Sequence, residues 1–346
     1  MAHGRCAAHA PISLMRMMSV VHITNPDGHR AAYRDMLASE LGYTALTGPA
    51  KRYFFVLLRS RKVLFATLDG DIDRFLLIGF LRCLLLKPTC GLFVSPLRYL
   101  RKPVTFRERV RAWGFRVARH MPFVRVFSII PHPVRPELSL VTRDWVHDPQ
   151  LWDLPSLRSA CLPETELSCR VLAKKGNRKV ILFLGKGSKK KGLPDLVRLT
   201  AGLEHEVLVV VAGRVMSECE RDASSLIERG MIVEGRFISD EELLSLYGVA
   251  DRVWCVYRPE YDQASGVFGR AIQLGVTPII RSGSVLEEYA DFIGATVIKL
   301  AGNSDTHSEA LKADILCSQK GDSDTRESLI EGFRNDALEK LVRALG

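Results

Sequence analysis

The stretch that decides the fold is residues 179–212, KVILFLGKGSKKKGLPDLVRLTAGLEHEVLVVVA. Its two continuous apolar runs, Lys179–Leu184 and Glu206–Val211, are typical of strands buried on both faces of a parallel sheet. Between them, Pro194–Leu203 has helical character, with the proline in the first turn, where its missing N–H costs nothing. This strand–loop–helix–strand order predicts a doubly wound α/β sheet.

The same alternation extends in both directions along the chain. Downstream we predict strands at Met231–Glu234, Arg252–Val256 and Thr277–Arg281, and helices at Glu218–Glu228, Glu241–Tyr247, Val267–Leu274 and Glu327–Leu345. Upstream we predict strands at Val20–Thr24, Val63–Thr67, Gly91–Ser95 and Val126–Ile130, and helices at Arg30–Leu41, Phe75–Leu86 and Val104–His120. Because ligands of such sheets bind at the carboxyl ends of the strands, the loops after these strands are the candidate sites.

A length of 346 residues suggests two domains, and the proline-punctuated region 131–163 leads to the boundary between them. We predict a disordered tail or mis-assigned start over 1–18, an N-terminal Rossmann-like domain over 19–165, a second Rossmann-like domain over 166–322, and a C-terminal helix in 323–346 that packs back on the first domain.

Composition excludes several classes of protein. Hydrophobic residues make up 47% and charged residues 25% of the chain, the balance of a globular protein with a sizeable core. The longest apolar run, Phe75–Leu86, contains Arg82 and is shorter than the roughly 18–20 residues of a membrane-spanning helix. The eight cysteines show no C-x-x-C spacing, so they indicate neither a zinc site nor a disulfide framework and fit free thiols in a reducing cytoplasm.

The net charge of +10 is concentrated in the first half of the chain. Residues 1–160 carry 24 Lys and Arg against 11 Asp and Glu, whereas the rest carries 25 against 28. The segment Arg98–His120 holds eight basic residues and one acid, interleaved with Phe106, Trp113 and Phe115. Such a field attracts an anionic surface. We favour a membrane surface over a solvated basic helix, and no nucleic-acid recognition motif supports nucleic acid as the partner.

Two loops at the ends of predicted strands carry groups suited to a phosphate. Residues 184–192 (LGKGSKKKG) do not fit a P-loop, but they place glycines and four lysines between a strand and a helix. In residues 262–271, Ser265 and Gly266 precede a helix, so the first amides of that helix are free to bind an anion. The alternatives are a solvated charge run and an ordinary serine N-cap. A third turn, Gly283-Ser284, is followed by Glu287 and Glu288.

The order of these segments resembles the nucleotide-sugar domain of retaining GT-B glycosyltransferases (group 1, family 4-like) of bacterial polysaccharide type. The family often shows G-R-x-x-x-x-K-G, then a G-R-F strand end with acids, a Tyr and an Ala-Asp, and finally a helix, a glycine and a Pro-Val-Ile-like strand. The corresponding residues of this chain are Gly185, Lys186, Lys191 and Gly192, then Gly235-Arg236-Phe237, Asp240-Glu241-Glu242, Tyr247 and Ala250-Asp251, and finally residues 271–280 (AIQLGVTPII). These segments span about a third of the chain.

The resemblance implies a GT-B fold, with two Rossmann-like domains facing a cleft, and transfer of a sugar from a nucleotide-sugar donor with retention. It implies that the donor diphosphate is bound by Gly185, Lys186, Lys191, Ser265, Gly266 and Val267, and that Phe237 and Asp262 line the donor sugar or base pocket. The lysines would stabilise the charge that develops on the leaving diphosphate. We therefore expect no metal ion and no cofactor.

The chain departs from the family at one position. The family commonly has two Glu separated by seven residues, and the two positions are Asp262 and Arg270 here. The second Glu usually contacts the donor ribose, a role that we do not assign to Arg270. This substitution motivates an alternative, a catalytically degenerate scaffold. Gain of turnover by Arg270→Glu would support that alternative. A basic nucleic-acid-binding protein is a third, weaker reading.

The resemblance assigns the acceptor to the N-terminal domain. There, His29 and Asp69 follow predicted strands and could orient or deprotonate an acceptor hydroxyl. The alternatives are a turn residue for His29 and a helix N-cap for Asp69. The basic N-terminal half favours a glycan or lipid-linked acceptor at the inner face of the cell membrane, as in exopolysaccharide or lipopolysaccharide synthesis, and hence a cytoplasmic, peripheral membrane location.

Overall fold

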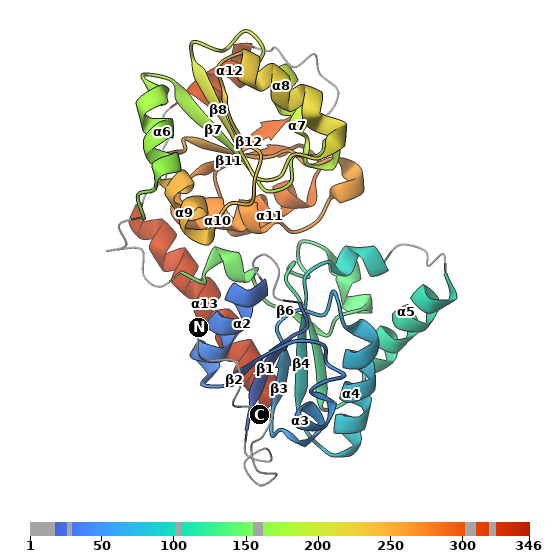
Figure 1. Cartoon of the computed structure of the whole chain (residues 1–346). Coiled ribbons are helices and arrows are strands. Elements are labelled where there is room, and N and C mark those ends of the chain that lie inside the picture. Colours follow the sequence, from blue (N-terminus) through green and yellow to red (C-terminus); the bar gives the residue numbers. More distant parts are fainter. Residues whose placement is uncertain (1–17, 26–29, 101–104, 155–161, 302–308, 318–322) are drawn as a thin grey trace. The chain divides into compact units, whose positions relative to one another are not determined.

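The computed structural model describes residues 18–25, 30–100, 105–154, 162–301, 309–317 and 323–346 (Figure 1). It divides into two compact units, Met1–Pro149 with Gly332–Gly346, and Gln150–Glu331. The sequence-based boundary at 165/166 lies further along the chain. Residues 1–17 of the predicted tail lie outside the described residues, and so does His29.

Unit 1 is built on a parallel six-stranded sheet in the order β2-β1-β3-β4-β5-β6. Its strands are β1 (Val20–Ile23), β2 (Thr44–Thr47), β3 (Val63–Phe65), β4 (Thr89–Phe93), β5 (Val124–Ser128) and β6 (Asp144–Trp145). Its helices are α2 (Arg30–Leu41), α3 (Phe54–Arg59), α4 (Ile72–Leu84) and α5 (Phe106–Ala118), with short 3₁₀ turns η2 (Pro96–Tyr99) and η3 (Pro136–Leu140).

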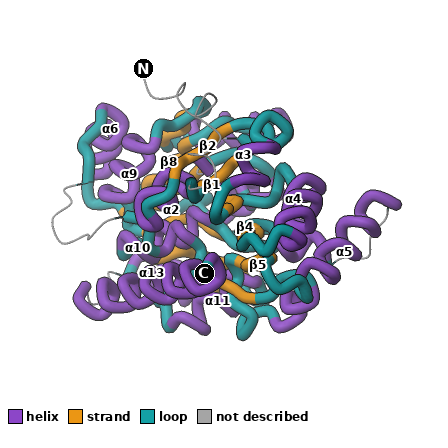
Figure 2. Tube along the Cα trace, turned by 90° about the horizontal axis from the view of Figure 1, so that it is seen from below, coloured by secondary structure: helices purple, strands orange, loops and turns teal. Residues whose placement is uncertain are grey.

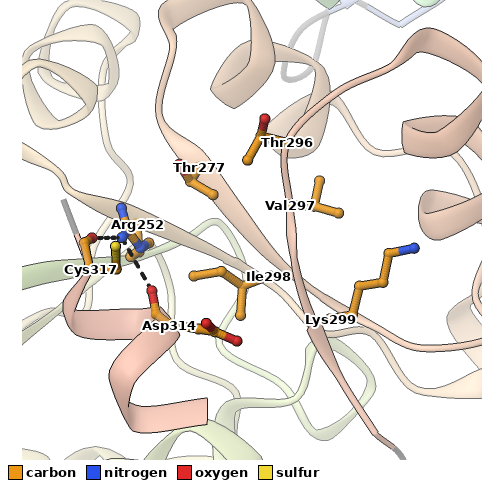
Figure 3. A pocket seen from close by; sticks show the side chains of 8 residues that line it. All are labelled: Arg252, Thr277, Thr296, Val297, Ile298, Lys299, Asp314 and Cys317. Carbon is orange, nitrogen blue, oxygen red and sulfur yellow. Dashed lines mark hydrogen bonds between the residues drawn. The ribbon is translucent and has the colours of Figure 1, made fainter. Parts of the chain in front are cut away.

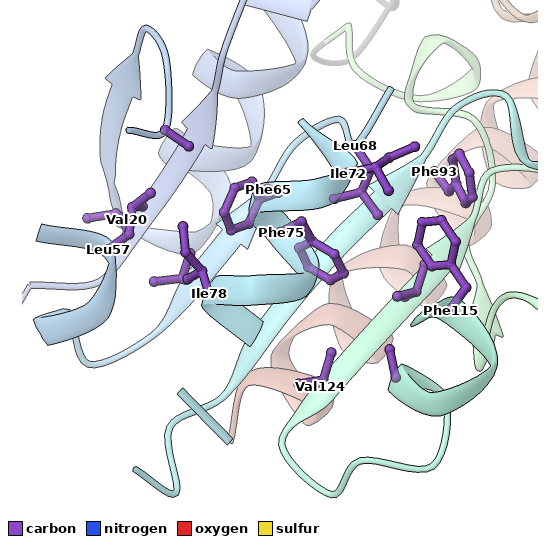
Figure 4. Close-up of a cluster of buried hydrophobic side chains, with 14 of the residues drawn as sticks. Val20, Leu57, Phe65, Leu68, Ile72, Phe75, Ile78, Phe93, Phe115 and Val124 are labelled. Atoms are coloured by element: carbon purple, nitrogen blue, oxygen red, sulfur yellow. The ribbon is translucent and has the colours of Figure 1, made fainter. Parts of the chain in front are cut away.

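Aromatic side chains fill the core of unit 1 between the sheet and helices α3, α4 and α5 (Figure 4). Phe65 meets Phe75 edge to face with ring centroids 5.3 Å apart, and Phe93 stacks on Phe115 at 4.9 Å. Both are geometries that aromatic pairs prefer. Phe115 was expected among the aromatics of the basic surface, and it is fully buried instead, because the sheet-facing side of α5 carries it.

Helix α4 corrects a second expectation. The apolar run Phe75–Leu86 predicts a buried helix, yet only one face of α4 is buried, and Leu77, Phe80 and Leu84 are 52%, 52% and 67% exposed. A run that is apolar all round does not tell which face meets the core, since periodicity is what carries that information. No helix in the described part of the chain is both long and apolar enough to cross a membrane.

The C-terminal helix α13 (Ser323–Leu345) starts in unit 2 and ends in unit 1. In its second half, Arg334 pairs with Glu40 at 2.7 Å, and the Phe333 ring lies 4.0 Å from that of His147. The ammonium of Lys340 sits 3.5 Å above the ring centroid of Trp145. These contacts join α13 to helix α2 and to the strand end of β6.

Unit 2 holds a second parallel sheet, in the order β12-β11-β10-β7-β8-β9. Its strands are β7 (Lys179–Leu184), β8 (Val207–Ala212), β9 (Ile232–Glu234), β10 (Arg252–Cys255), β11 (Thr277–Arg281) and β12 (Ile298–Leu300). Its helices are α6 (Glu166–Lys175), α7 (Leu193–Leu199), α8 (Glu220–Glu228), α9 (Asp240–Val249), α10 (Gly266–Leu274), α11 (Val285–Ile293) and α12 (Glu309–Leu316), with 3₁₀ turns η4 (Pro149–Leu151), η5 (Lys189–Lys191), η6 (Ser217–Cys219) and η7 (Pro259–Tyr261). Figure 2 shows the helices and strands of the chain coloured by type.

Candidate functional site

The sheet of unit 2 reverses its winding between β7 and β10. Strands β8 and β9 follow on one side of β7, and β10, β11 and β12 lie on the other. At such a point the loops leaving the two central strands turn in opposite directions and open a crevice at the carboxyl edge. The loop after β7 contains Gly185, Lys186 and Lys191, and the segment after β10 leads to Ser265. The two loops predicted from the sequence therefore flank the switch point.

The lysine loop, residues 185–192, is shaped by its two end glycines. Gly185 has φ +86°, and a Cβ on it would lie 2.8 Å from Nζ of Lys191. Nζ of Lys191 donates to the carbonyl oxygen of Leu184 over 3.4 Å. Gly192 has φ +75°, and a Cβ there would lie 2.3 Å from the carbonyl oxygen of Val256. Glycine is therefore needed at both ends to turn the loop back over the strand ends.

The lysine loop is fastened to the segment that follows β10. The backbone amide of Arg258 donates to the carbonyl of Lys190 at 3.0 Å, and the indole N–H of Trp254 donates to the carbonyl of Lys191 at 3.2 Å. Trp254 is itself buried in the sheet. These bonds fix the loop relative to β10, so the backbone of Lys191 is held by contacts with the buried sheet.

Lys191 is a mostly buried cation. Burial lowers the pKa of its ammonium group below the usual value, and the neighbouring charge of Lys186 lowers it further. Among the described residues, neither lysine forms an ion pair with a carboxylate. The Nζ atom lies 6.0 Å from the centroid of the Tyr257 ring. A buried cation without a counter-ion favours binding of an anion, because the anion replaces the favourable interactions with water that the cation loses on burial.

Tyr257 links this cation to the start of α10. Its hydroxyl lies 2.7 Å from Oγ of Ser265, which in turn accepts the amide of Phe268 at 3.4 Å as the N-cap of the helix. Burial raises the pKa of Tyr257 well above its usual range, so the phenol stays neutral. The two predicted phosphate loops thus converge on one aromatic side chain that sequence reasoning missed, although Tyr257 follows directly on an apolar strand.

Gly266, the first residue of α10, has a packing partner of its own. A Cβ on Gly266 would lie 1.2 Å from Oε1 of Gln150, so a larger residue there would have to displace the end of that side chain. The carbonyl of Val267 accepts the hydroxyl of Tyr247 at 3.0 Å. The first turn of α10 is therefore held from two sides by groups within unit 2.

The two residues expected in the donor sugar or base pocket lie apart. Asp262 forms an ion pair with Arg281 at 3.2 Å and accepts the amide of Val285 at 3.1 Å, which ties the β10 segment to β11 and α11. Phe237 is 80% exposed and follows β9, the edge strand of the sheet. The structure does not bring Phe237 together with Lys191 and Ser265.

Arg270, at the position where the family has its second Glu, has a structural partner. Its guanidinium binds the Asp153 carboxylate with two parallel bonds of 2.6 and 2.8 Å, and Nη1 also donates to Oε1 of Gln273 at 2.5 Å. The two charged side chains are 9% and 7% exposed. Arg270 therefore fastens the segment after η4 to α10 and does not point at the lysine loop.

Unit 1 has its own switch point, between β1 and β3. Asp69 lies in the loop after β3, where its carboxylate accepts the amides of Val94 and Ser95 at 2.9 and 3.1 Å. It is not the N-cap of α4; Asp71 holds that position and makes no side-chain cap bond. Asp71 instead pairs with Arg74 at 2.5 Å and accepts the hydroxyl of Thr24.

Arg214 is a further cation near the lysine loop that the sequence analysis did not single out. It follows Gly213, whose Cβ would lie 2.3 Å from the carbonyl oxygen of Gly185, and its own carbonyl accepts the amide of Gly187 at 3.0 Å. The Arg214 side chain is exposed. A Gly-Arg pair directly after an apolar strand is the signal that could have identified it.

A cavity of about 300 Å³ lies at the opposite edge of the unit 2 sheet (Figure 3). It is lined by the first residues of β10, β11 and β12, and Arg252 in its wall donates to the carbonyls of Cys317 and Asp314. Since these are the amino ends of parallel strands, the cavity is separate from the lysine loop. No group of three His, Cys, Asp or Glu in the described ranges is placed to hold a metal ion.

Neither a family model nor a curated protein matches the sequence. Solved structures do match. Anabaena HepE in complex with UDP is 11% identical, with 93% of this chain and 96% of that chain covered and a TM-score of 0.60. Sucrose-phosphate synthase from Thermosynechococcus elongatus is 11% identical, with 94% and 98% covered and a TM-score of 0.59.

A glycosyltransferase from Rickettsia africae is 14% identical, with 94% and 97% covered and a TM-score of 0.55. These matches cover more than nine-tenths of the chain and therefore both units, each of which holds a six-stranded parallel sheet. The chain has the GT-B fold. The predicted fold class, two Rossmann-like domains of GT-B type, is confirmed.

Proposed function

We propose that this GT-B chain is a glycosyltransferase that moves a sugar from a nucleotide-sugar donor to a glycan or lipid-linked acceptor, with retention at the anomeric carbon. The observation that carries the proposal is the convergence of Lys191, Tyr257 and Ser265 at the switch point of unit 2. HepE and Staphylococcus aureus MnaA, which share the fold, are known in complex with UDP. A nucleoside diphosphate is therefore the anion that best fits this place.

The proposed reaction requires a site that stabilises a leaving diphosphate. Lys191, held at the strand ends, and the exposed Lys186 beside it supply positive charge where negative charge develops. The first turn of α10 adds backbone amides and the positive end of the helix dipole. Tyr257 stays neutral and adds no opposing charge. Because two lysines and a helix terminus supply this charge, we propose that turnover needs no metal ion or other cofactor.

The donor roles of the remaining residues follow the same scheme. Gly185, Gly266 and Val267 would let the diphosphate approach the backbone. Asp262 would act through Arg281, which its carboxylate holds at the crevice edge. Phe237, exposed after β9, would contact the base only in the nucleotide complex.

On the acceptor side, the switch point of unit 1 is the place for the hydroxyl that attacks. Asp69 is fixed by two backbone amides, so it can hold an acceptor hydroxyl in one orientation. His29 is proposed for proton transfer on its sequence position alone. We propose a hexosyltransferase of bacterial exopolysaccharide or lipopolysaccharide synthesis that acts in the cytoplasm.

The test is release of nucleoside diphosphate from a panel of UDP-, GDP- and ADP-sugars, with EDTA present. We expect turnover with one donor, product of unchanged anomeric configuration by NMR, and loss of turnover in Lys191→Met. The neighbouring variant Lys190→Met removes the same charge from the same loop and serves as the matched control. Absence of turnover with every donor, while a nucleotide still binds, would favour the degenerate scaffold and overturn the enzyme.

A further inference from the structure

Helix α5 presents an apolar stripe to solvent. Phe106, Val110, Trp113 and Val117 follow one another at steps of four, three and four residues, which places them on one helix face. Their side chains are 79%, 47%, 65% and 38% exposed. The opposite face carries the buried Phe115, which packs into the unit 1 core. The helix therefore buries one apolar face and leaves a second one uncovered.

Helix α4, which is in contact with α5, carries a second exposed stripe. Asp73, Leu77, Phe80 and Leu84 share one face of α4 by the same spacing. Asp73, at the head of this stripe, binds both Arg107 and Arg111 of α5, with Nε of Arg111 at 2.6 Å. Figures 1 and 2 both show α4 and α5 next to each other at one side of the unit 1 sheet.

The two stripes together exceed what isolated exposed side chains explain. Single exposed hydrophobic residues are normal on a soluble protein, but contiguous apolar patches mark a surface that binds something. The stripe of α5 holds a Trp and a Phe, large side chains whose exposure is unfavourable in water. The pair Leu85-Leu86, 52% and 71% exposed, extends the apolar surface past the end of α4.

Basic residues frame this apolar surface. Arg109 and Arg116 are exposed on α5 and pair with no carboxylate in the described part of the chain. The acids of the two helices are Asp73 and Glu108; Asp73 is neutralised by Arg107 and Arg111, and Glu108 closes the capping box with Thr105. An apolar stripe containing Trp, bordered by arginines, matches a helix that lies in the headgroup region of an anionic bilayer.

We propose that unit 1 docks on an anionic lipid bilayer through α5 and α4, with Phe106, Trp113 and Leu84 entering the interface. Trp and Phe suit the boundary between headgroups and acyl chains. Arg109 and Arg116 contact the phosphates of the headgroups. This docking goes beyond the donor chemistry and holds whether or not the chain transfers a sugar.

The charge pattern favours lipid over other occupants. In a second copy of this chain, stripe-to-stripe pairing brings the arginines that border the two stripes towards one another, and like charges disfavour such contacts. The phosphates of nucleic acid bind arginines, but exposed Val and Leu side chains make no favourable contact with them. An anionic bilayer interacts favourably with both the apolar stripe and the arginines that border it.

The test is flotation of the full chain with phosphatidylcholine vesicles containing either no or about 30% phosphatidylglycerol. We expect binding to the anionic vesicles and a blue shift of the Trp113 emission on binding. Phe106→Ser with Trp113→Ser lowers binding at least about tenfold, since it removes the largest inserted side chains. Arg109→Gln with Arg116→Gln lowers it by about tenfold or more, at roughly fivefold per charge.

Matched controls lie on α8 in unit 2, where Ile227→Ser and Arg221→Gln remove an exposed apolar side chain and an exposed charge. Both are expected to bind vesicles like the wild type. The proposal is overturned if anionic vesicles fail to bind, if the α5 variants bind as well as the α8 controls, or if light scattering shows a dimer that the α5 variants dissociate. Preferential, salt-sensitive binding of duplex RNA or DNA by the same arginines would also overturn it.

Discussion

The buried pair of Arg270 and Asp153 gives a prediction that can be worked out from the structure. Two parallel bonds join the side chains, which are 9% and 7% exposed. Arg270→Met leaves the Asp153 carboxylate buried without its partner, which costs about 3–5 kcal/mol in other buried pairs. Asp153→Leu leaves the guanidinium with Gln273 alone and is expected to cost a similar amount. Removing both charges is expected to cost at least about 2 kcal/mol less than the sum, because neither charge is then left unpaired.

The assay is urea unfolding followed by the fluorescence of Trp152 and Trp254, which are both buried in unit 2. A Trp113→Phe/Trp145→Phe background removes the signal of unit 1. The exposed pair Arg343–Glu339 is the control, and Arg343→Met is expected to cost no more than about 0.5 kcal/mol. A loss below about 1 kcal/mol in Arg270→Met, or strict additivity in the double variant, refutes the reasoning.

The same pair changes what an acid at position 270 would do. Arg270→Glu sets two carboxylates against each other in a buried place, so it is expected to destabilise unit 2 more than Arg270→Met does. Gain of turnover from this substitution is therefore not expected, because Arg270 is held in an ion pair with Asp153.

Two further predictions concern pH. Burial lowers the pKa of Lys191, and only the protonated form of its side chain attracts a diphosphate. Nucleotide affinity is therefore expected to fall as pH rises through that lowered pKa, and Lys191→Arg is expected to flatten the profile. Titration calorimetry between pH 7 and 10 checks this. Burial also lowers the pKa of His147 to about 4. Because the unfolded state binds the proton more readily, His147 alone is expected to lower stability by about 3 kcal/mol as pH drops from 6.5 to 4. His147→Leu should reduce the slope in urea titrations by that amount and leave the contribution of His22 and His132, whose pKa burial also lowers.

Continuous apolar runs made the strands predictable. Thr277–Arg281 was predicted with the observed bounds, as was helix Arg30–Leu41. Strands β2, β6 and β12 and helices α3, α6, α11 and α12 were missed; of these, the strands and α3 are short. Most other ends differ by one or two residues, as terminal turns fray, but α7 ends four residues earlier than predicted, and α4 and α13 begin three and four residues earlier.

Contacts between distant residues were out of reach of sequence reasoning. Arg270 and Asp153 are 117 positions apart, and no local pattern joins them. The convergence of the lysine loop and α10 on Tyr257 depends on strand order, which fixes β10 beside β7. The exposed stripe of α4 was hidden for a different reason, since Leu and Phe on both faces of a helix look alike in a sequence.

The central claim, a diphosphate site built on Lys191, Tyr257 and Ser265, is tested most directly by calorimetry with UDP, GDP and ADP in EDTA. The account predicts that one nucleotide binds without metal and that Lys191→Met weakens it at least about tenfold, the value of a lost charge-assisted bond. Lys190→Met, which removes a charge from the same loop, should bind within about twofold of the wild type. Equal losses in the two variants, or unchanged binding in Lys191→Met, would contradict the account.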